Sequence, residues 1–406
     1  MGNSPGTALS DEREAVALRP RSRKAPIVLL AGAFIVLSVY ALAHPLHDFV
    51  EYWTASRLLV AHQNPYSIAD VAKIEHSLGF EQEMPLMLLS PPCALALIAP
   101  LGLTQSYGLA CFFWTLALIM ATAVASRLLM DVYFGDVRLC EISDTVFYRS
   151  LFAFTFFPIL LCLRFAQTVP LALLGLAGFV YFERRKPFVA GALLSLTLIK
   201  PHLVLLVWAV LILHCLQRRR WSIVFGALGA VLLLTGISLW FDHHILRDYL
   251  DLTGGPYLQA YAAGIAALIR KPFGGIGTLW IQLIPTFCGL AWLAVYWRKH
   301  RNQWSWNERL PMVLTVSVLT CAYGWAFDET LLALPVMYLA GHWARRTGSI
   351  PFKLVVTYSV LNLALMLTWP IPTVGLLPAP ILLIVMMARK MQNSSATSFS
   401  VAVGSS

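Results

Sequence analysis

The sequence predicts an all-α integral membrane protein, a bundle of about twelve transmembrane helices. Of its 406 residues 58% are hydrophobic and only 12% are charged, whereas soluble domains carry about 25% charged residues. Apolar runs long enough to cross a bilayer recur along nearly the whole chain, with Arg/Lys clusters between them. Topogenic basic clusters of this kind mark the cytoplasmic ends of spans. No segment of ordinary soluble-domain length is left over.

The charge and the cysteines exclude other classes of protein. The net charge of +10 does not indicate nucleic-acid binding, because the basic residues sit in short clusters between spans. The expected partner is therefore a lipid bilayer and no nucleic acid. The seven cysteines have neither metal nor disulfide spacing, and most lie in apolar runs. We expect no metal site.

Residues 1–25 are expected to form a cytoplasmic tail, because four basic residues between Arg19 and Lys24 precede the first apolar run, 26–43. This run lacks a clear small-residue cleavage site, so we interpret it as a retained span rather than a signal peptide. The chain then emerges on the outer side of the membrane, where an outer loop is expected over 44–106.

The apolar run 84–103 decides the orientation of everything after it. If it crosses the membrane, the clusters at 184–186 and 218–220 both fall outside, against the positive-inside rule. The run also contains four prolines, which interrupt a membrane helix. We therefore expect interfacial helices here, with a span as the alternative.

The remaining crossings follow from the same rule. A second outer loop covers 242–275, both chain ends lie inside, and the membrane domain as a whole covers 26–390. The Ser-rich segment 391–406 is expected to be a disordered tail. The expected spans after the first are 107–126, 150–164, 168–182, 187–199, 202–216, 222–241, 276–297, 310–326, 330–343, 351–369 and 375–388.

Acidic and basic residues are mixed on the expected outer face, whereas the inner clusters are nearly all Arg and Lys. Acidic groups bordering a membrane are costly, so the outer face is expected to carry the function. Asp48 and Glu51 are three residues apart and share a helix face. A carboxylate there can act as a general base. The alternative is a solvated interfacial turn, with Arg57 paired to one of the acids.

Basic residues on the same face are candidates for holding a phosphate. Lys200 lies at an outer span end, followed two residues later by His202. It can bind a phosphate as a point charge or simply extend to the interface. Arg270 and Lys271 in the second outer loop are further candidates, or else ordinary loop residues.

Other outer residues carry weaker signals. His243 and His244 are adjacent and lack the spacing of metal ligands. Tyr52 and Tyr66 are expected to be interfacial anchors, with stacking on a sugar ring as the alternative. No phosphate-binding glycine loop is present.

The order of motifs along the chain is more specific. It runs through Asp48-Phe49, Tyr52-Trp53, Ala55, Asn64-Pro65-Tyr66, Pro91-Pro92, Pro100-Leu101, Gln167, Ala190-Gly191, Lys200-Pro201 and a last segment from Trp325 to Pro335. This series resembles glycosyltransferase family 87, the polyprenyl-phosphate-sugar-dependent membrane glycosyltransferases, which include α-mannosyltransferases. Two features depart from the family pattern. Ala166 stands where Gly often precedes the Gln, and the paired His that some mannosyltransferases have near 327–329 is absent.

The resemblance implies a GT-C fold, in which the first outer loop carries interfacial helices and a catalytic Asp. Asp48 is then the catalytic base, supported by Glu51 and Arg57. The reaction implied is inverting transfer of a hexose, most simply mannose, from a polyprenyl-phosphate donor to a hydroxyl of a lipid-linked or cell-envelope glycan. It takes place on the outer face of the plasma membrane without a cofactor. The donor-phosphate candidates are Lys200, His202, Arg270 and Lys271, and the substrate-binding candidates are Tyr52, Tyr66, Gln167 and Asp328.

Two other classes of function remain as alternatives. A transporter or flippase of lipid-linked sugars would have functional polar residues near mid-membrane, internal repeats and broken helices. No convincing repeat is visible, and the mixed polar residues gather at one face. A membrane scaffold without chemistry leaves Asp48 and Lys200 unexplained.

Overall fold

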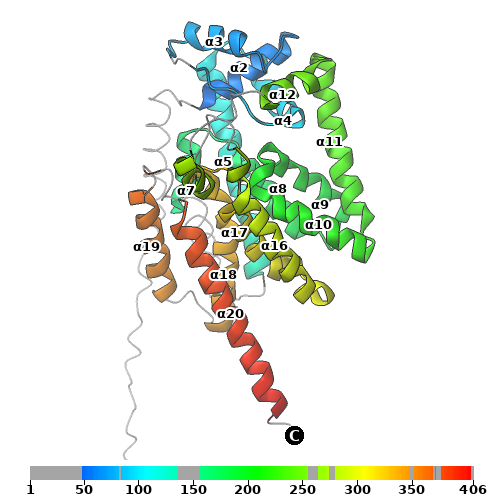
Figure 1. Cartoon of the computed structure of the whole chain (residues 1–406), viewed down its shortest axis with the longest axis vertical. Helices are drawn as coiled ribbons and strands as arrows, with labels where there is room; N and C mark the ends of the chain where they lie inside the picture. The colour runs from blue at the N-terminus through cyan, green and yellow to red at the C-terminus, as the bar shows by residue number, and fades with distance from the viewer. Residues whose placement is uncertain are drawn as a thin grey trace, which may run out of the picture.

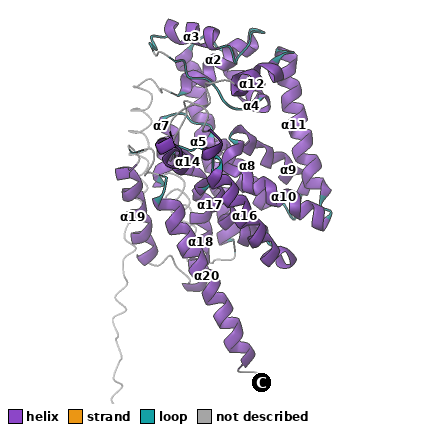
Figure 2. Ribbon diagram, viewed as in Figure 1, coloured by secondary structure: helices purple, strands orange, loops and turns teal. Residues whose placement is uncertain are grey.

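The computed structural model describes residues 48–81, 84–135, 155–254, 264–273, 279–347, 352–368, 371 and 376–403. These residues form helices and connecting turns without a strand (Figure 2). The predicted all-α class is confirmed. The expected N-terminal tail and first span, 1–25 and 26–43, lie outside the described residues.

The helices follow one another with short connections (Figure 1). In chain order they are α2 (Phe49–Val60), α3 (Ile68–Ser77), α4 (Pro92–Ile98), η1 (Ala99–Leu103), α5 (Tyr107–Phe134), α7 (Phe157–Arg164), α8 (Val169–Phe182), α9 (Pro187–Leu194), η2 (Ser195–Ile199), η3 (Pro201–Val204), α10 (Leu205–Arg218), α11 (Trp221–Phe241), α12 (Ile245–Gly254), α14 (Ile265–Arg270), η4 (Lys271–Phe273), α15 (Leu279–Gln282), α16 (Ile284–His300), η6 (Arg301–Gln303), α17 (Trp306–Leu319), η7 (Ala326–Leu332), α18 (Ala333–Thr347), α19 (Phe352–Thr368) and α20 (Pro378–Val403).

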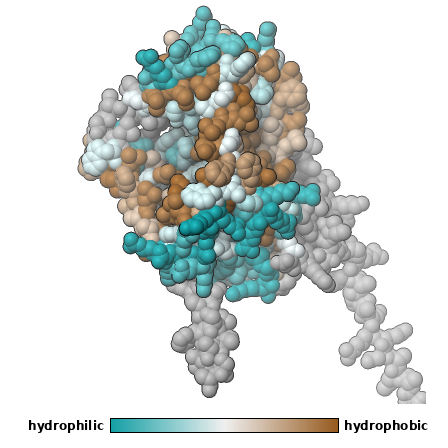
Figure 3. All heavy atoms as spheres, turned by 90° about the vertical axis from the view of Figure 1, so that its right-hand side faces the viewer, coloured by the Kyte–Doolittle hydropathy of each residue, from teal (hydrophilic) through white to brown (hydrophobic). Residues whose placement is uncertain are grey.

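Four helices within the described ranges are long and apolar enough to cross a membrane: Tyr107–Phe134, Pro201–Arg218, Trp221–Phe241 and Trp280–Gln303. An apolar band lies between two hydrophilic zones on the face that carries α11 (Figure 3). We conclude that the chain is a membrane protein. Several other expected spans coincide with shorter helices, such as α8, so the count of about twelve stays a prediction.

Lipid-facing side chains of α11 explain this band. Phe225, Leu232, Leu233 and Trp240 are 60–77% exposed. A soluble monomer rarely exposes so continuous an apolar patch. Hydrocarbon is the solvent that suits these side chains.

The run 84–103 is not one continuous helix. An extended stretch leads to α4, and η1 follows it directly. Pro92 lies in the first turn of α4 and Pro100 in the first turn of η1, a position where proline's missing N–H costs nothing. The two short helices lie with α2, α3 and α12 at one end of the molecule (Figure 1). We call this end the α2 end.

A glycine lets α2 approach η1 closely. A Cβ on Gly102 would lie 2.2 Å from the carbonyl oxygen of Ser56. The Nη1 of Arg57 donates a hydrogen bond of 2.9 Å to the Gly102 carbonyl, and its guanidinium lies 5.9 Å from the centre of the Trp53 ring. Arg57 therefore joins α2 to η1.

Two glycines bring α9 and α11 into backbone contact. A Cβ on Gly191 would lie 1.9 Å from the Ile223 carbonyl oxygen, and one on Gly226 would lie 1.9 Å from that of Phe188. Small residues at such crossings let membrane helices pack tightly without a hydrophobic driving force. This packing fixes α9, which leads into η2 and Lys200.

The C-terminal helix α20 continues through Val403, whereas a disordered tail was expected from residue 391. The segment 391–403 contains neither Gly nor Pro, so the first strong helix breaker after Pro380 is Gly404. The expected disordered tail stays a prediction.

Candidate active site

Asp48 and Gln167 are directly joined. Asp48 is half-buried and occupies the N-cap position of α2. Its Oδ2 accepts a hydrogen bond of 2.7 Å from Nε2 of Gln167, which lies between α7 and α8. The two residues are 119 positions apart in the sequence, so the contact is made by tertiary packing of α2 against this turn.

The turn that carries Gln167 is held by backbone geometry. Ala166 has φ of 53°, in the left-handed region that favours glycine. The Gln167 N–H donates to the Cys162 carbonyl at 2.9 Å, and Trp114 Nε1 donates to the Ala166 carbonyl at 2.8 Å. This conformation gives a physical reason for the Gly that often stands at this position in the resembling family.

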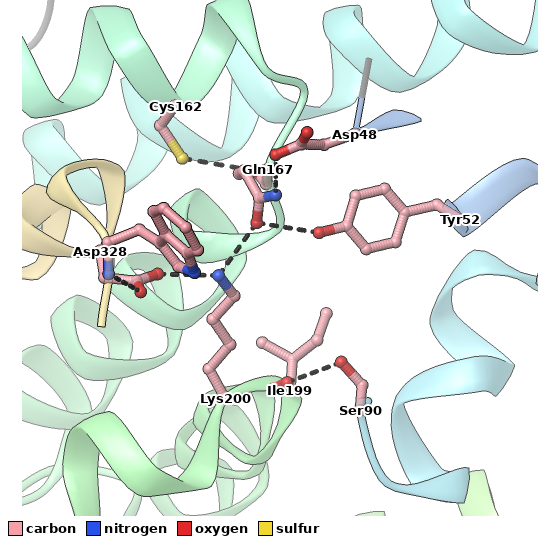
Figure 4. A network of polar contacts seen from close by, with 9 residues as sticks. Asp48, Tyr52, Ser90, Cys162, Gln167, Ile199, Lys200 and Asp328 are labelled. Atoms are coloured by element: carbon pink, nitrogen blue, oxygen red, sulfur yellow. Dashed lines mark hydrogen bonds and ion pairs between the residues drawn. The ribbon is translucent and has the colours of Figure 1, made fainter. Parts of the chain in front are cut away.

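The amide oxygen of Gln167 accepts two further hydrogen bonds. Tyr52 donates its hydroxyl at 2.9 Å, and Lys200 donates from Nζ at 2.9 Å (Figure 4). Asp48 and Tyr52 are one helical turn apart on α2, so both reach the same amide. One side chain thus connects an acid, a phenol and an ammonium group.

Lys200 lies at the break between η2 and η3. Its Nζ is 2.7 Å from Oδ1 of Asp328, and the side chains are 15% and 1% exposed, respectively. The ammonium also lies 4.7 Å from the centre of the Phe327 ring. Ser90 Oγ, in the extended stretch before α4, donates to the Ile199 carbonyl at 2.9 Å and so connects that stretch to this break.

Asp328 is fixed by its own helix. The Trp325 backbone N–H donates to Asp328 Oδ2 at 2.9 Å, as in a capping box at the start of η7. One carboxylate oxygen therefore holds the backbone and the other holds Lys200. We call the five residues Asp48, Tyr52, Gln167, Lys200 and Asp328 the polar network.

The model of glycosyltransferase family 87 matches residues 88–335, more than half of the chain. The chain belongs to glycosyltransferase family 87. This confirms the predicted family and makes the protein a membrane glycosyltransferase. The match contains Gln167, Lys200 and Asp328, while Asp48 precedes it. No curated protein and no solved structure matches the chain.

Glu51 of this family 87 glycosyltransferase lies on α2, one turn from Asp48. Burial raises its pKa to about 8, and the negative charge of Asp48 adds to the effect. Glu51 is therefore mostly protonated at neutral pH. Arg57 donates to the Gly102 carbonyl, and its predicted role in supporting Asp48 stays a prediction.

Three other predicted site residues of the glycosyltransferase make their described contacts elsewhere. Tyr66 donates its hydroxyl to the Ser90 carbonyl at 2.8 Å. His202 stacks on Tyr323 with ring centres 3.9 Å apart. Arg270 Nη1 donates to the Gln282 side chain at 2.9 Å. Lys271 follows directly in η4. Their predicted roles toward a substrate stay predictions.

A polar cavity opens between the α2–α3 turn and α12 of the family 87 protein. Its volume is about 500 Å³, and it is lined by Asn64, Asp242, His244, Arg247, Asp248 and Asp251. Within the described ranges, no group of three or more His, Cys, Asp or Glu is arranged to hold a metal ion.

The Ser90 and Trp325 contacts had no signal in the sequence, because each uses a backbone carbonyl or N–H.

Proposed function

We propose that this glycosyltransferase transfers a hexose, mannose by resemblance, from a polyprenyl-phosphate donor to a hydroxyl of a lipid-linked or cell-envelope glycan. The transfer is inverting and takes place on the outer face of the plasma membrane. One observation carries the proposal. The Gln167 amide joins an acid, Asp48, to a cation, Lys200, through hydrogen bonds of 2.7 and 2.9 Å. Inverting transfer of a sugar uses a base on the attacking side of the anomeric carbon and a positive charge near the departing phosphate on the opposite side.

Asp48 is the general base. It takes the proton from the acceptor hydroxyl as that oxygen attacks the anomeric carbon, and the bond from this carbon to the phosphate oxygen breaks with its electron pair. The anomeric configuration inverts because attack and departure take place on opposite faces. Help from a positioned base is worth about 10²–10⁴ in rate.

Lys200 stabilises the departing phosphate. The leaving phosphate is a weak base, so a cation suffices and no general acid is required. A lysine ammonium has three N–H donors, and Gln167 and Asp328 take two of them. The third suits a phosphate oxygen. His202, Arg270 and Lys271 are further candidates for donor binding.

Product formation tests this proposal. The purified protein, in lipid nanodiscs, is incubated with a radiolabelled polyprenyl-phosphate mannose and a lipid extract. We expect a new labelled glycolipid, and its loss in the Asp48→Asn variant. Movement of the labelled donor across the bilayer without a covalent product would instead support a flippase and refute the transferase mechanism. Parallel incubations with polyprenyl-phosphate glucose identify the sugar.

A further inference from the structure

We infer that Gln167 is a positioning residue and does not bind the substrate. It holds the base, Asp48, and the phosphate-binding cation, Lys200, in fixed positions relative to each other. The inference rests on the proposed roles of Asp48 and Lys200. It goes beyond them because it assigns a separate task to the amide between the two charges.

The hydrogen-bonding capacity of Gln167 is largely used within the protein. A glutamine side chain has two N–H donors and an oxygen with two lone pairs. Tyr52 and Lys200 occupy both lone pairs, and Asp48 takes one donor. The residue is only 4% exposed. A sugar hydroxyl would find one N–H at most, so contact with substrate is a poor account of this side chain.

The surroundings permit a single amide orientation. If the amide were turned over, its NH₂ group would face the Lys200 ammonium and its oxygen would face the Asp48 carboxylate. Donor would then meet donor, and acceptor would meet acceptor. The observed orientation places the positive end of the amide dipole against the acid and the negative end against the cation.

This orientation has consequences for the base. A hydrogen bond donated to a carboxylate favours its ionised form, which is the form that accepts a proton from the acceptor. The same bond aims Asp48, while Tyr52 gives α2 a second attachment to the amide. Titratable groups near Asp48 include Glu51 and Tyr52 on α2, Tyr107 on α5 and the Lys200–Asp328 ion pair.

Two variants separate positioning from bulk packing. Gln167→Met keeps the length of the side chain but removes every polar atom. A hydrogen bond to a charged group is worth roughly a 10- to 100-fold change, so we expect kcat/KM to fall by about this factor. The fall should be in kcat more than in KM for the acceptor, because no substrate contact is lost.

Gln167→Glu keeps an acceptor for Tyr52 and Lys200 but places a second carboxyl group 2.7 Å from Asp48. The two carboxyls then share a proton and titrate as a coupled pair. Activity needs that shared proton, since it restores a donor toward Asp48. We expect the ratio of variant to wild-type kcat/KM to rise as pH falls from about 8 to about 6.

A structural amide elsewhere provides the matched control. Asn362 on α19 accepts from the Phe157 N–H and donates to the Tyr358 carbonyl. Asn362→Leu should lower the thermal stability while leaving the pH profile unchanged. A Gln167→Glu profile parallel to the wild type, or wild-type kcat/KM in Gln167→Met, would overturn the inference. If Asp48→Asn is also fully active, the proposed base has failed instead.

Discussion

Replacing Lys200 with methionine removes the cation from a buried ion pair. The Nζ lies 2.7 Å from Asp328 Oδ1, and the Asp328 side chain is only 1% exposed. Without the ammonium, the carboxylate keeps the Trp325 backbone N–H as its described hydrogen-bond donor. Removing one partner of a buried pair costs about 3–5 kcal/mol. We expect the free energy of unfolding of Lys200→Met to fall by this amount.

The double variant Lys200→Met/Asp328→Asn distinguishes the ion pair from a general packing defect. It removes both charges, and the new amide oxygen can still accept from the Trp325 N–H. Neutral replacement of a whole buried pair is often harmless to stability, so most of the lost stability should return. Turnover should not return, because the cation for the phosphate is still missing.

Thermal denaturation in detergent and turnover of labelled donor measure the two effects separately. If the double variant is as unstable as the single one, the loss does not come from an unpaired Asp328 carboxylate. If the double variant turns over donor at the wild-type rate, Lys200 does not stabilise the leaving phosphate. Either result would refute the corresponding part of the reasoning.

Three further predictions follow from other residues. Asp48→Asn should lower turnover by about 10²–10⁴ with little change in melting temperature; full turnover in a folded variant excludes Asp48 as the base. Because the pKa of Glu51 is raised from 4.5 to about 8, its contribution to stability is complete below about pH 4.5 and is lost as pH rises through about 8. Glu51→Gln should therefore flatten the pH–stability curve in this range, and an unchanged curve would contradict the burial effect. Gly226→Ala forces a Cβ against a backbone oxygen 1.9 Å away and should cost about 1–3 kcal/mol, whereas the control Gly229→Ala has open space and should be neutral or stabilising; equal effects in thermal denaturation would argue against the close α9–α11 contact.

Local patterns predicted most of the helix positions. The run expected at 168–182 is α8, Val169–Phe182, and the run expected at 222–241 is α11, Trp221–Phe241. Hydropathy and basic clusters are properties of neighbouring residues, so they can be read directly from the chain.

The site could be predicted only in part. Residue type and place made Asp48 and Lys200 candidates, but their connection could not be predicted, because it passes through Gln167 and through packing of α2 against the α7–α8 turn. The hydrogen bond from Arg57 to the Gly102 carbonyl could not be predicted either. Contacts with backbone atoms leave no trace in side-chain patterns.

The Lys200–Asp328 contact spans 128 residues and the Asp48–Gln167 contact spans 119. Pairings between such distant segments form only after the intervening chain is in place. During synthesis, a nascent chain in which η7 has not yet been made lacks Asp328, the partner of Lys200. Its polar network is therefore incomplete. The polar network is complete only once η7 has been made, and a chain truncated before Ala326 would lack the anion that pairs with Lys200.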